Sequence, residues 1–290
     1  MNEAVCTAYA KINLSLDVVS KMENGYHALR MIMEQVTLCD DIRLRPASGT
    51  GVRLETNLSY LPRDGRNIAV KAARIFFQET GIRNAALCIK IRKRIPVCAG
   101  LGGGSADAAA VLRALNRLYG TGLPAASLRE LGERLGSDVP YCVSGGTALA
   151  EGRGERLTPL PALPPCHILL CKPGFSISTA TLFRRIRLDR IRHRPDTAGL
   201  LQALEGGDLA AVARRMYNVF EEVLGGERGE VEALKSALLD HGALGASMSG
   251  TGPTVFGIFD DREKAAAAFE ALRAVYRECF LTENVPAVQA

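Results

Sequence analysis

The 290-residue chain contains no tryptophan, and aromatic residues make up only 6% of it. Proteins that hold single-stranded nucleic acids stack bases on aromatic side chains, so this scarcity counts against such a role. No apolar run approaches the ~18 residues that a membrane span requires. The start of the chain lacks the basic and apolar segments of a secretion signal. We therefore expect a cytoplasmic protein with no membrane partner.

Lysine is also scarce, because 28 of the 36 basic residues are arginines and only 8 are lysines. The densest run, 184–194, holds six arginines, and 90–94 is a second basic cluster. With a net charge of +5, three interpretations stay open. A solvated surface is favoured, a site for an anionic small molecule comes second, and nucleic-acid binding comes last.

The eight cysteines include no C-x-x-C pair, which argues against a zinc or redox motif. Five of them lie in apolar, strand-like segments, so we expect free thiols that pack as small hydrophobic residues. The length and the 47% hydrophobic content predict about two domains with a substantial core.

Hydrophobic periodicity predicts sheet and helix in both halves without strict βαβ alternation, which indicates an α+β protein. The first half is expected to hold an antiparallel sheet from strands at 5–19, 32–38, 41–45 and 52–55, with another strand at 86–95. Its predicted helices are 67–81, 105–119 and 127–135, the last opened by a capping box of Ser127 and Glu130. The proline-rich stretch 158–165 is the expected interdomain linker. The second half is expected to contain strands at 167–171 and 254–259, helices beginning at Thr179, Asp196, Asp208 and Glu227, and a helix over 262–279.

The strongest motif is the segment 96–106, P-V-C-A-G-L-G-G-G-S-A, between a predicted strand and a predicted helix. Glycines allow a backbone to approach a ligand closely and to turn its N–H groups toward one point. The helix that follows adds the positive end of its dipole. A tight turn is the alternative, but a turn needs one or two glycines and this loop has four. We therefore expect a phosphate-binding loop.

The common nucleotide-binding loops do not fit this segment. A P-loop requires a Gly-Lys pair, which the chain lacks, and the G-x-G-x-x-G fingerprint fails at Ser105. The H-R-D and D-F-G motifs of protein kinases are missing as well. The segment instead resembles the P-x-x-x-G-L-G-x-[GS]-S-[AS] loop shared by galactokinase, homoserine kinase, mevalonate kinase and phosphomevalonate kinase.

Two more segments resemble motifs of this superfamily. The segment 8–14, A-Y-A-K-I-N-L, is similar to its N-terminal strand, with Tyr9 in place of a proline. The segment 246–256, A-S-M-S-G-T-G-P-T-V-F, is similar to its third, glycine-containing motif. Within the superfamily, Gly25-Tyr26-His27 and the segments 135–140 and 172–179 resemble the 4-diphosphocytidyl-2-C-methyl-D-erythritol kinases.

This resemblance implies a two-domain α+β fold with the active site in the cleft between the domains. Residues 1–160 would be the ATP-binding domain, with the fold of a ribosomal-protein domain, and 161–290 a ferredoxin-like domain. The implied reaction is ATP-dependent phosphorylation of the 2-hydroxyl of 4-diphosphocytidyl-2-C-methyl-D-erythritol, in the non-mevalonate isoprenoid pathway. ATP with Mg²⁺, a small-molecule substrate and a monomer or homodimer follow from the same resemblance, and no nucleic-acid partner is expected.

The resemblance also assigns roles to residues. Lys11 and Asp138 are the expected catalytic pair, with Asp138 as the base, and the Ser105 hydroxyl is a candidate ligand of ATP-bound Mg²⁺. The expected ATP-binding residues are Pro96, Val97, Cys98, Ala99, Gly100, Leu101, Gly102, Gly103, Gly104, Ser105 and Ala106. The expected substrate-binding residues are Asn13, Tyr26, His27, Thr179 and Phe183. The third glycine motif contributes Ser249, Gly250, Thr251 and Gly252.

Several alternatives stay open on the residues alone. Asp138 and Ser105 are also ordinary helix-capping residues, Lys11 suits a strand edge, and His27 suits a turn or a core. A related superfamily kinase of homoserine or mevalonate type, a nucleotide sensor and a nucleic-acid-binding module are the competing functions. We also hypothesise that Arg184 and Arg185 help to hold the substrate's diphosphate.

Overall fold

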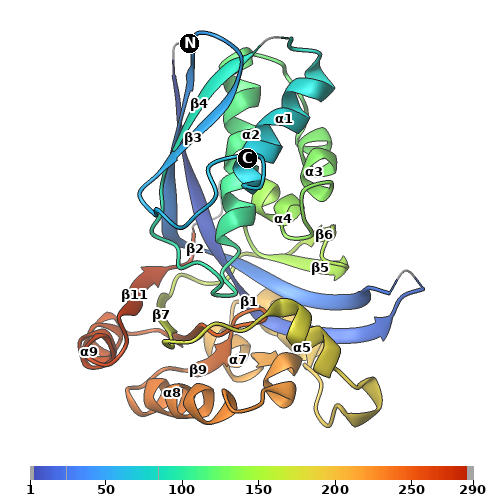
Figure 1. Ribbon diagram of the computed structural model, residues 1–290. Coiled ribbons are helices and arrows are strands. Elements are labelled where there is room, and N and C mark those ends of the chain that lie inside the picture. Colours follow the sequence, from blue (N-terminus) through green and yellow to red (C-terminus); the bar gives the residue numbers. More distant parts are fainter. Residues whose placement is uncertain (1–2, 24, 84, 286–290) are drawn as a thin grey trace. The chain divides into compact units, whose positions relative to one another are not determined.

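The computed structural model describes residues 3–23, 25–83 and 85–285, which form two compact units (Figure 1). Unit 1 comprises the described residues up to 10 together with 39–97 and 102–145. Unit 2 comprises 11–38, 98–101 and the described residues from 146 onward. Both units combine strands and helices, which confirms the α+β class.

Unit 1 is a mixed sheet covered by helices. Strand β4 (Ala86–Arg92) pairs antiparallel with the second half of β2 (His27–Pro46) and parallel with β3 (Gly51–Thr56). The expectation of an antiparallel sheet is therefore wrong for the segment 52–55, which pairs parallel as part of β3 because helix α1 connects β3 to β4 in the same direction. The helices of this unit are α1 (Ile68–Thr80), α2 (Gly103–Tyr119), α3 (Ala125–Glu133) and α4 (Val139–Ser144).

The ends of these helices follow local capping chemistry. Helix α1 begins where the Asn67 side chain accepts a hydrogen bond from the backbone of Ala69, and it ends at the left-handed Gly81, as expected. Helix α3 begins directly after Pro124 and has no side-chain capping bond. The expected capping box at Ser127 is therefore wrong, because the helix starts two residues earlier and Ser127 lies inside its first turn.

Unit 2 contains two groups of strands and the remaining helices. In the first group, β2 pairs antiparallel with β5 (Ala148–Gly152), β5 pairs antiparallel with β6 (Arg156–Pro159), and β1 (Ala4–Lys21) pairs parallel with β8 (Tyr217–Asn218). The second group is an antiparallel sheet in the order β11-β7-β10-β9. Its strands are β7 (His167–Lys172), β9 (Gly245–Met248), β10 (Val255–Phe259) and β11 (Glu278–Glu283).

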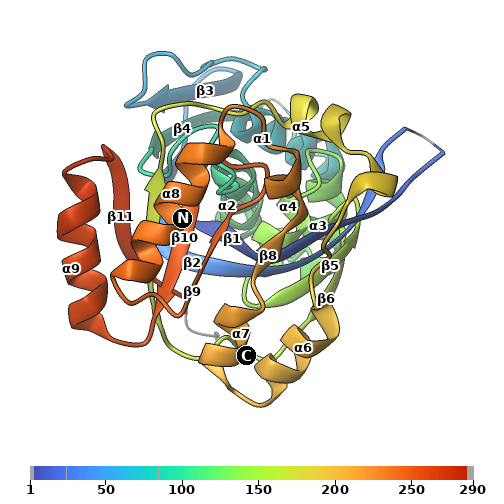
Figure 2. The same cartoon turned by 90° about the horizontal axis from the view of Figure 1, so that it is seen from below.

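Helices α8 (Arg228–Asp240) and α9 (Arg262–Arg273) pack against this antiparallel sheet (Figure 2). The other elements of unit 2 are α5 (Thr179–Arg185), α6 (Thr197–Glu205), α7 (Leu209–Arg214) and the 3₁₀ turns η1 (Leu188–Arg190) and η2 (Val219–Val223). The helix expected over 262–279 ends at Arg273, because Cys279 and its neighbours instead pair with β7 as strand β11.

The structure differs from two further expectations. The strands expected at 32–38 and 41–45 form one continuous strand, β2, whose two halves belong to different units. The proline-rich stretch 158–165 does not join the compact units, since it lies inside unit 2. There Leu163 is buried, and its backbone N–H donates to the Thr147 hydroxyl at 3.0 Å. The expected domain boundary at residue 160 stays a prediction.

All eight cysteines are free thiols, as expected. Four are buried, namely Cys142, Cys166, Cys171 and Cys279, whereas Cys98 is exposed in the glycine loop. Among the described residues, no helix is both long enough and apolar enough to span a membrane.

Candidate active site

Strand β1 carries Lys11 and Asn13 on one face, because alternate residues of a strand point to the same side. Both side chains are buried, and the Lys11 Nζ donates to the Asn13 Oδ1 at 2.8 Å. The Asn13 amide in turn donates to the Met31 sulfur at 3.4 Å. The buried ammonium is therefore held in one orientation by an expected substrate-binding residue. Its expected pairing with Asp138 stays a prediction.

The third glycine motif forms a turn between β9 and β10 that lies against this pair. Gly250 and Gly252 have φ angles of 57° and 71°, and the Gly252 N–H donates to the Ser249 carbonyl at 2.9 Å. A Cβ atom on Gly250 would lie only 3.2 Å from the Lys11 Nζ and 3.4 Å from the Asn13 Oδ1. The structure thus brings Lys11, Asn13 and Gly250 together, although they are far apart in sequence.

The part of the glycine loop that belongs to unit 2, residues 98–101, is bonded to the same turn. The Ser249 hydroxyl donates to the Gly100 carbonyl at 3.0 Å, and the backbone N–H of Lys11 donates to the Leu101 carbonyl at 3.0 Å. Gly100 has a φ of 76°, and a Cβ there would lie 2.1 Å from the Ser249 carbonyl oxygen. Only glycine fits at position 100.

The rest of the loop forms the start of helix α2 in unit 1. Gly102, with a φ of 67°, occupies the N-cap position, and no side chain caps the helix. The N-cap alternative for Ser105 is therefore wrong, because Ser105 is the third helical residue. An uncapped N-terminus of a 17-residue helix presents backbone N–H groups and a positive dipole end to an anion. The local structure fits the expected phosphate-binding role.

Asp138 occupies the N-cap position of α4 but makes no side-chain capping bond. The interpretation of Asp138 as a side-chain cap is therefore wrong, and its catalytic role stays a prediction. Helix α4 is fixed to α2 by the Arg113 guanidinium, which donates to the Cys142 carbonyl. Asp138 is half-buried, and within unit 1 it lies at the start of a helix whose position is fixed by the contact with α2.

The expected substrate-binding residues include an aromatic group in unit 2. The ring of His27 stacks on Phe183, with centroids 5.2 Å apart and planes at 29°. Phe183 also packs edge-on against Phe220, at 4.9 Å between centroids. Burial, together with the charge of Lys21, lowers the pKa of His27, so the ring is neutral at pH 7.

Tyr26 and Thr179 occupy two other surroundings in unit 2. Tyr26 is 58% exposed, and the Arg153 guanidinium lies 5.5 Å from the centre of its ring. The Thr179 hydroxyl is 2.9 Å from that of Thr251, which connects the start of α5 to the third glycine motif. Tyr26 is therefore largely exposed with a guanidinium group over its ring, while Thr179 lies beside the turn of the third glycine motif.

The sequence analysis did not single out Asn218 and Glu221, whose side chains form hydrogen bonds with the turn of the third glycine motif and the strand before it. The fully buried Asn218 amide donates to the carbonyls of Met248 and Gly250, at 2.7 and 2.8 Å. The Glu221 carboxylate accepts from the Met248 N–H at 2.8 Å and pairs with Lys235 at 2.5 Å. Polar side chains inside the otherwise apolar stretch 217–224 are the signal that could have identified them.

A second buried charge cluster lies beneath the first turn of α2 in unit 1. The Lys93 ammonium lies 2.5 Å from Asp40 and 2.7 Å from Asp107, and all three side chains are buried. Burial raises the pKa of Asp107 to about 7, although Lys93 opposes the shift. The sequence interpretation of the cluster 90–94 as a solvated basic surface is therefore wrong for Lys93, which is buried. A Cβ on Gly103 would approach its Nζ to 3.4 Å.

Within the described ranges, no group of three or more His, Cys, Asp or Glu side chains could hold a metal ion. The residues do fit a metal that arrives as a complex with a nucleotide, since the uncapped start of α2 suits phosphate and carries the Ser105 hydroxyl.

Comparison with known proteins places the chain in one group. The family model of the GHMP kinases N terminal domain matches residues 67–146, and that of the GHMP kinases C terminal matches 200–278. A 4-diphosphocytidyl-2-C-methyl-D-erythritol kinase of Acetivibrio thermocellus is 42% identical over 96% of this chain and 98% of its own length. One of Lachnoclostridium phytofermentans is 45% identical over 90% of each chain.

Solved structures show the same grouping. A crystal structure of 4-(cytidine 5'-diphospho)-2C-methyl-D-erythritol kinase has a TM-score of 0.82 and 33% identity, covering 97% of this chain and 98% of that one. A homoserine kinase from Cytophaga hutchinsonii has a TM-score of 0.77 at 22% identity, covering 98% and 95% of the two chains. The second match concerns the fold alone.

Proposed function

Because the chain belongs to the GHMP kinases and, within them, to the 4-diphosphocytidyl-2-C-methyl-D-erythritol kinases, we propose that it phosphorylates this substrate. ATP donates the phosphoryl group to the 2-hydroxyl, giving the 2-phosphate and ADP, a step of non-mevalonate isoprenoid synthesis. The observation that carries the proposal is the 42% identity over 96% of the chain to a kinase of this name. The 22% identity to a homoserine kinase leaves that alternative supported by fold only.

The glycine loop is proposed to bind the phosphates of ATP. Backbone N–H groups at the uncapped start of α2 receive the phosphate oxygens, and the packing of Gly100 against Ser249 keeps residues 98–101 in shape. The Ser105 hydroxyl is the proposed protein ligand of Mg²⁺. When bound with ATP, this metal neutralises charge on the phosphates.

Lys11 and Asp138 are the proposed catalytic residues. Asp138 accepts the proton of the substrate's 2-hydroxyl. The hydroxyl oxygen then forms a bond to the γ-phosphorus of ATP while the bond between this phosphorus and ADP breaks. The ammonium of Lys11, held by Asn13, stabilises the negative charge that develops on the transferred group. Its burial supports this role, because few water molecules screen a buried charge.

The residues proposed to bind the cytidine part belong to unit 2. The exposed ring of Tyr26 and the stack of His27 on Phe183 are the proposed flat surfaces for a base. The neutral imidazole of His27, the Asn13 amide and the Thr179 hydroxyl are the proposed hydrogen-bonding groups. We further propose that the enzyme acts in the cytoplasm as a monomer or homodimer, without a nucleic-acid partner.

The test follows ADP release with ATP, Mg²⁺ and 4-diphosphocytidyl-2-C-methyl-D-erythritol in native protein and in Asp138→Asn. We expect turnover in the native protein and a fall of ~10² or more in the variant, since the proton acceptor is lost. Asp208→Asn is the matched control, because Asp208 does cap its helix through Ala211 and asparagine caps equally well.

Two outcomes would contradict the proposal in different ways. Absence of turnover from folded, ATP-binding native protein would reject the substrate, and homoserine and mevalonate would then be tried as acceptors. Full activity of Asp138→Asn would reject Asp138 as the base while leaving the substrate in place.

A further inference from the structure

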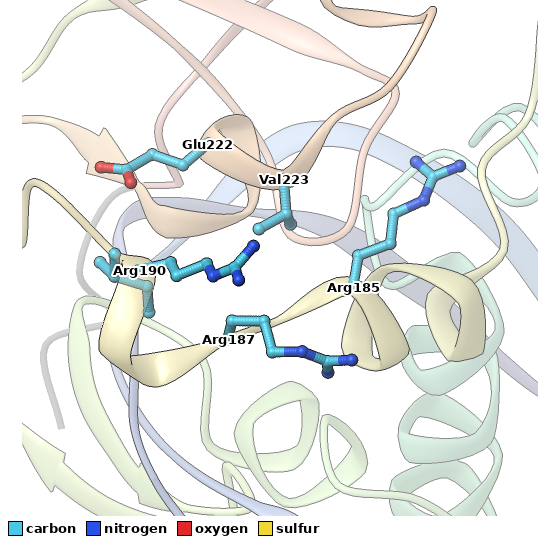
Figure 3. A pocket seen from close by; sticks show the side chains of 6 residues that line it. Arg185, Arg187, Arg190, Glu222 and Val223 are labelled. Carbon is cyan, nitrogen blue, oxygen red and sulfur yellow. The ribbon is translucent and has the colours of Figure 1, made fainter.

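An arginine-lined pocket lies in unit 2 between the segment 185–191 and turn η2 (Figure 3). Its volume is about 280 Å³. The lining residues are Arg185, Arg187, Arg190, Ile191, Glu222 and Val223. Three arginines therefore line one small pocket together with a single acidic residue.

The one acidic residue of the lining is committed to other partners. The Glu222 carboxylate accepts hydrogen bonds from the Tyr217 hydroxyl at 2.6 Å and from the backbone N–H groups of Arg192 and His193 at 2.8 Å each. Burial alone would raise the pKa of Glu222, but these bonds outweigh it and lower the pKa, so the group stays ionised. Figure 3 shows the carboxylate turned away from the arginines. Glu222 thus anchors the chain that follows Arg190 rather than neutralising the pocket.

The arginines themselves have weak partners or none. Arg185 pairs with Glu227 at 3.4 Å, and Arg187 donates to the carbonyls of Arg184 and Ile186 at 3.4 and 3.3 Å. Within the part of the chain that the structure describes, the Arg190 side chain has no ion pair or hydrogen bond. The pocket therefore carries an excess of positive charge, and planar guanidinium groups are well suited to bind phosphate oxygens.

The pocket is separate from the aromatic stack on the same helix. Phe183, which stacks with His27, and Arg185 are two residues apart on α5, which places them about 200° apart around the helix axis. They project from opposite sides of α5. The apolar side chains of Ile191 and Val223 complete the pocket and limit the access of water to its charges.

We propose that this pocket binds the diphosphate group of a small phosphorylated ligand. A diphosphate supplies several oxygens for more than one guanidinium group and balances the excess charge. Two sources share this chemistry. One is the diphosphate of the proposed substrate, and the other is a separate phosphorylated compound.

The test measures the binding of inorganic pyrophosphate to the full chain by titration calorimetry at constant ionic strength. We expect the double variant Arg187→Gln, Arg190→Gln to bind at least tenfold more weakly than the native protein. The control Arg214→Gln, Arg262→Gln removes the same charge from exposed positions of α7 and α9 and is expected to bind like the native protein. Val223→Phe fills the pocket without changing its charge and is expected to weaken binding as well.

The same titration with saturating cytidine diphosphate distinguishes the sources, and this comparison alone rests on the proposed function. Loss of pyrophosphate binding, with a raised KM for the substrate in the arginine variant, assigns the pocket to the substrate's diphosphate. Unchanged pyrophosphate binding and an unchanged KM assign it to a separate ligand. Equal pyrophosphate affinities in the pocket variants and the control, or no binding to the native protein, would overturn the proposal whatever the kinase assay shows.

Discussion

At the scale of single residues, Gly100 shows how closely the glycine loop is packed. Any Cβ at this position would overlap the Ser249 carbonyl, so Gly100→Ala has to displace residues 98–101 from the glycine turn. We expect the KM for ATP to rise about tenfold or more, because the loop loses the shape that is proposed to bind the phosphates of ATP. Steady-state kinetics with varied ATP provides the measurement.

A matched variant separates this crowding from simple backbone strain. Gly207 has a similar φ of 64°, but a Cβ there would meet nothing within 4 Å. Gly207→Ala is therefore expected to cost about 1 kcal/mol of stability and to leave the KM for ATP unchanged. If both alanine variants had the same KM for ATP, the contact between Gly100 and Ser249 would not contribute to ATP binding.

Glu34 predicts a pH dependence of stability. Burial raises the pKa of this carboxyl from 4.5 to about 8, against the opposing hydrogen bond from Thr147. Its contribution to stability is therefore complete below pH 4.5 and is lost as the pH rises through 8. We expect the unfolding free energy to fall over this range by up to about 1.4 kcal/mol per pH unit relative to Glu34→Gln.

Urea denaturation of the native protein and Glu34→Gln at pH 5 and pH 8 measures this difference. Glu205→Gln changes an exposed glutamate of α6 and should reproduce the native pH profile. Parallel profiles for all three proteins would show that Glu34 ionises normally in the fold.

At the scale of elements, the turn between β9 and β10 depends on the segment that begins at β8. Asn218→Asp replaces the amide donor with a carboxylate that faces the carbonyls of Met248 and Gly250. Buried carbonyls without donors are costly, so we expect the turn to shift and the KM for ATP to rise about tenfold, more than kcat falls. Kinetics with varied ATP tests this split.

The control for this variant is Asn116→Asp in unit 1. The Asn116 amide likewise donates to a backbone carbonyl, that of Leu123, at 2.8 Å. We expect this variant to lose stability while its KM for ATP stays native. Equal kinetic effects in the two variants would mean that Asn218 acts only through general stability.

The sequence predicts some of these elements well for local reasons. The glycine loop was predictable because four glycines in five residues have few structural explanations, and helix α1 because Asn67 and Gly81 cap it. The parallel pairing of β3 with β4 depends on partners distant in sequence, as does the strand at Cys279. Asn218 was missed for the same reason, since its two carbonyl partners lie 30 and 32 residues away.

At the scale of the whole molecule, unit 2 takes residues 11–38 from the start of the chain and its larger part from the described residues from 146 onward. Thr37 and Thr282 share a hydrogen bond of 2.8 Å, and β8 pairs with β1. A fragment of residues 161–290 lacks these partners. We expect it to melt at a lower temperature than unit 2 in the whole chain, or without a cooperative transition, as measured by circular dichroism.

The comparison requires a signal specific to unit 2, and hydrogen exchange in strands β7 and β10 supplies one. Equal protection of these strands in the fragment and in the whole chain would contradict the prediction and would favour the expected domain boundary at residue 160.

The interleaving of the two units also determines the order in which the chain completes them during synthesis. Every residue of unit 1 has been made once residue 145 is added, whereas unit 2 has to wait for β11 at Glu278–Glu283. At ~5–20 residues per second, residues 11–38 of the nascent chain wait ten seconds or more for their last partners. The unit 2 parts of the strands that carry Lys11 and His27 are therefore among the first parts to leave the ribosome and among the last to gain all of their partners.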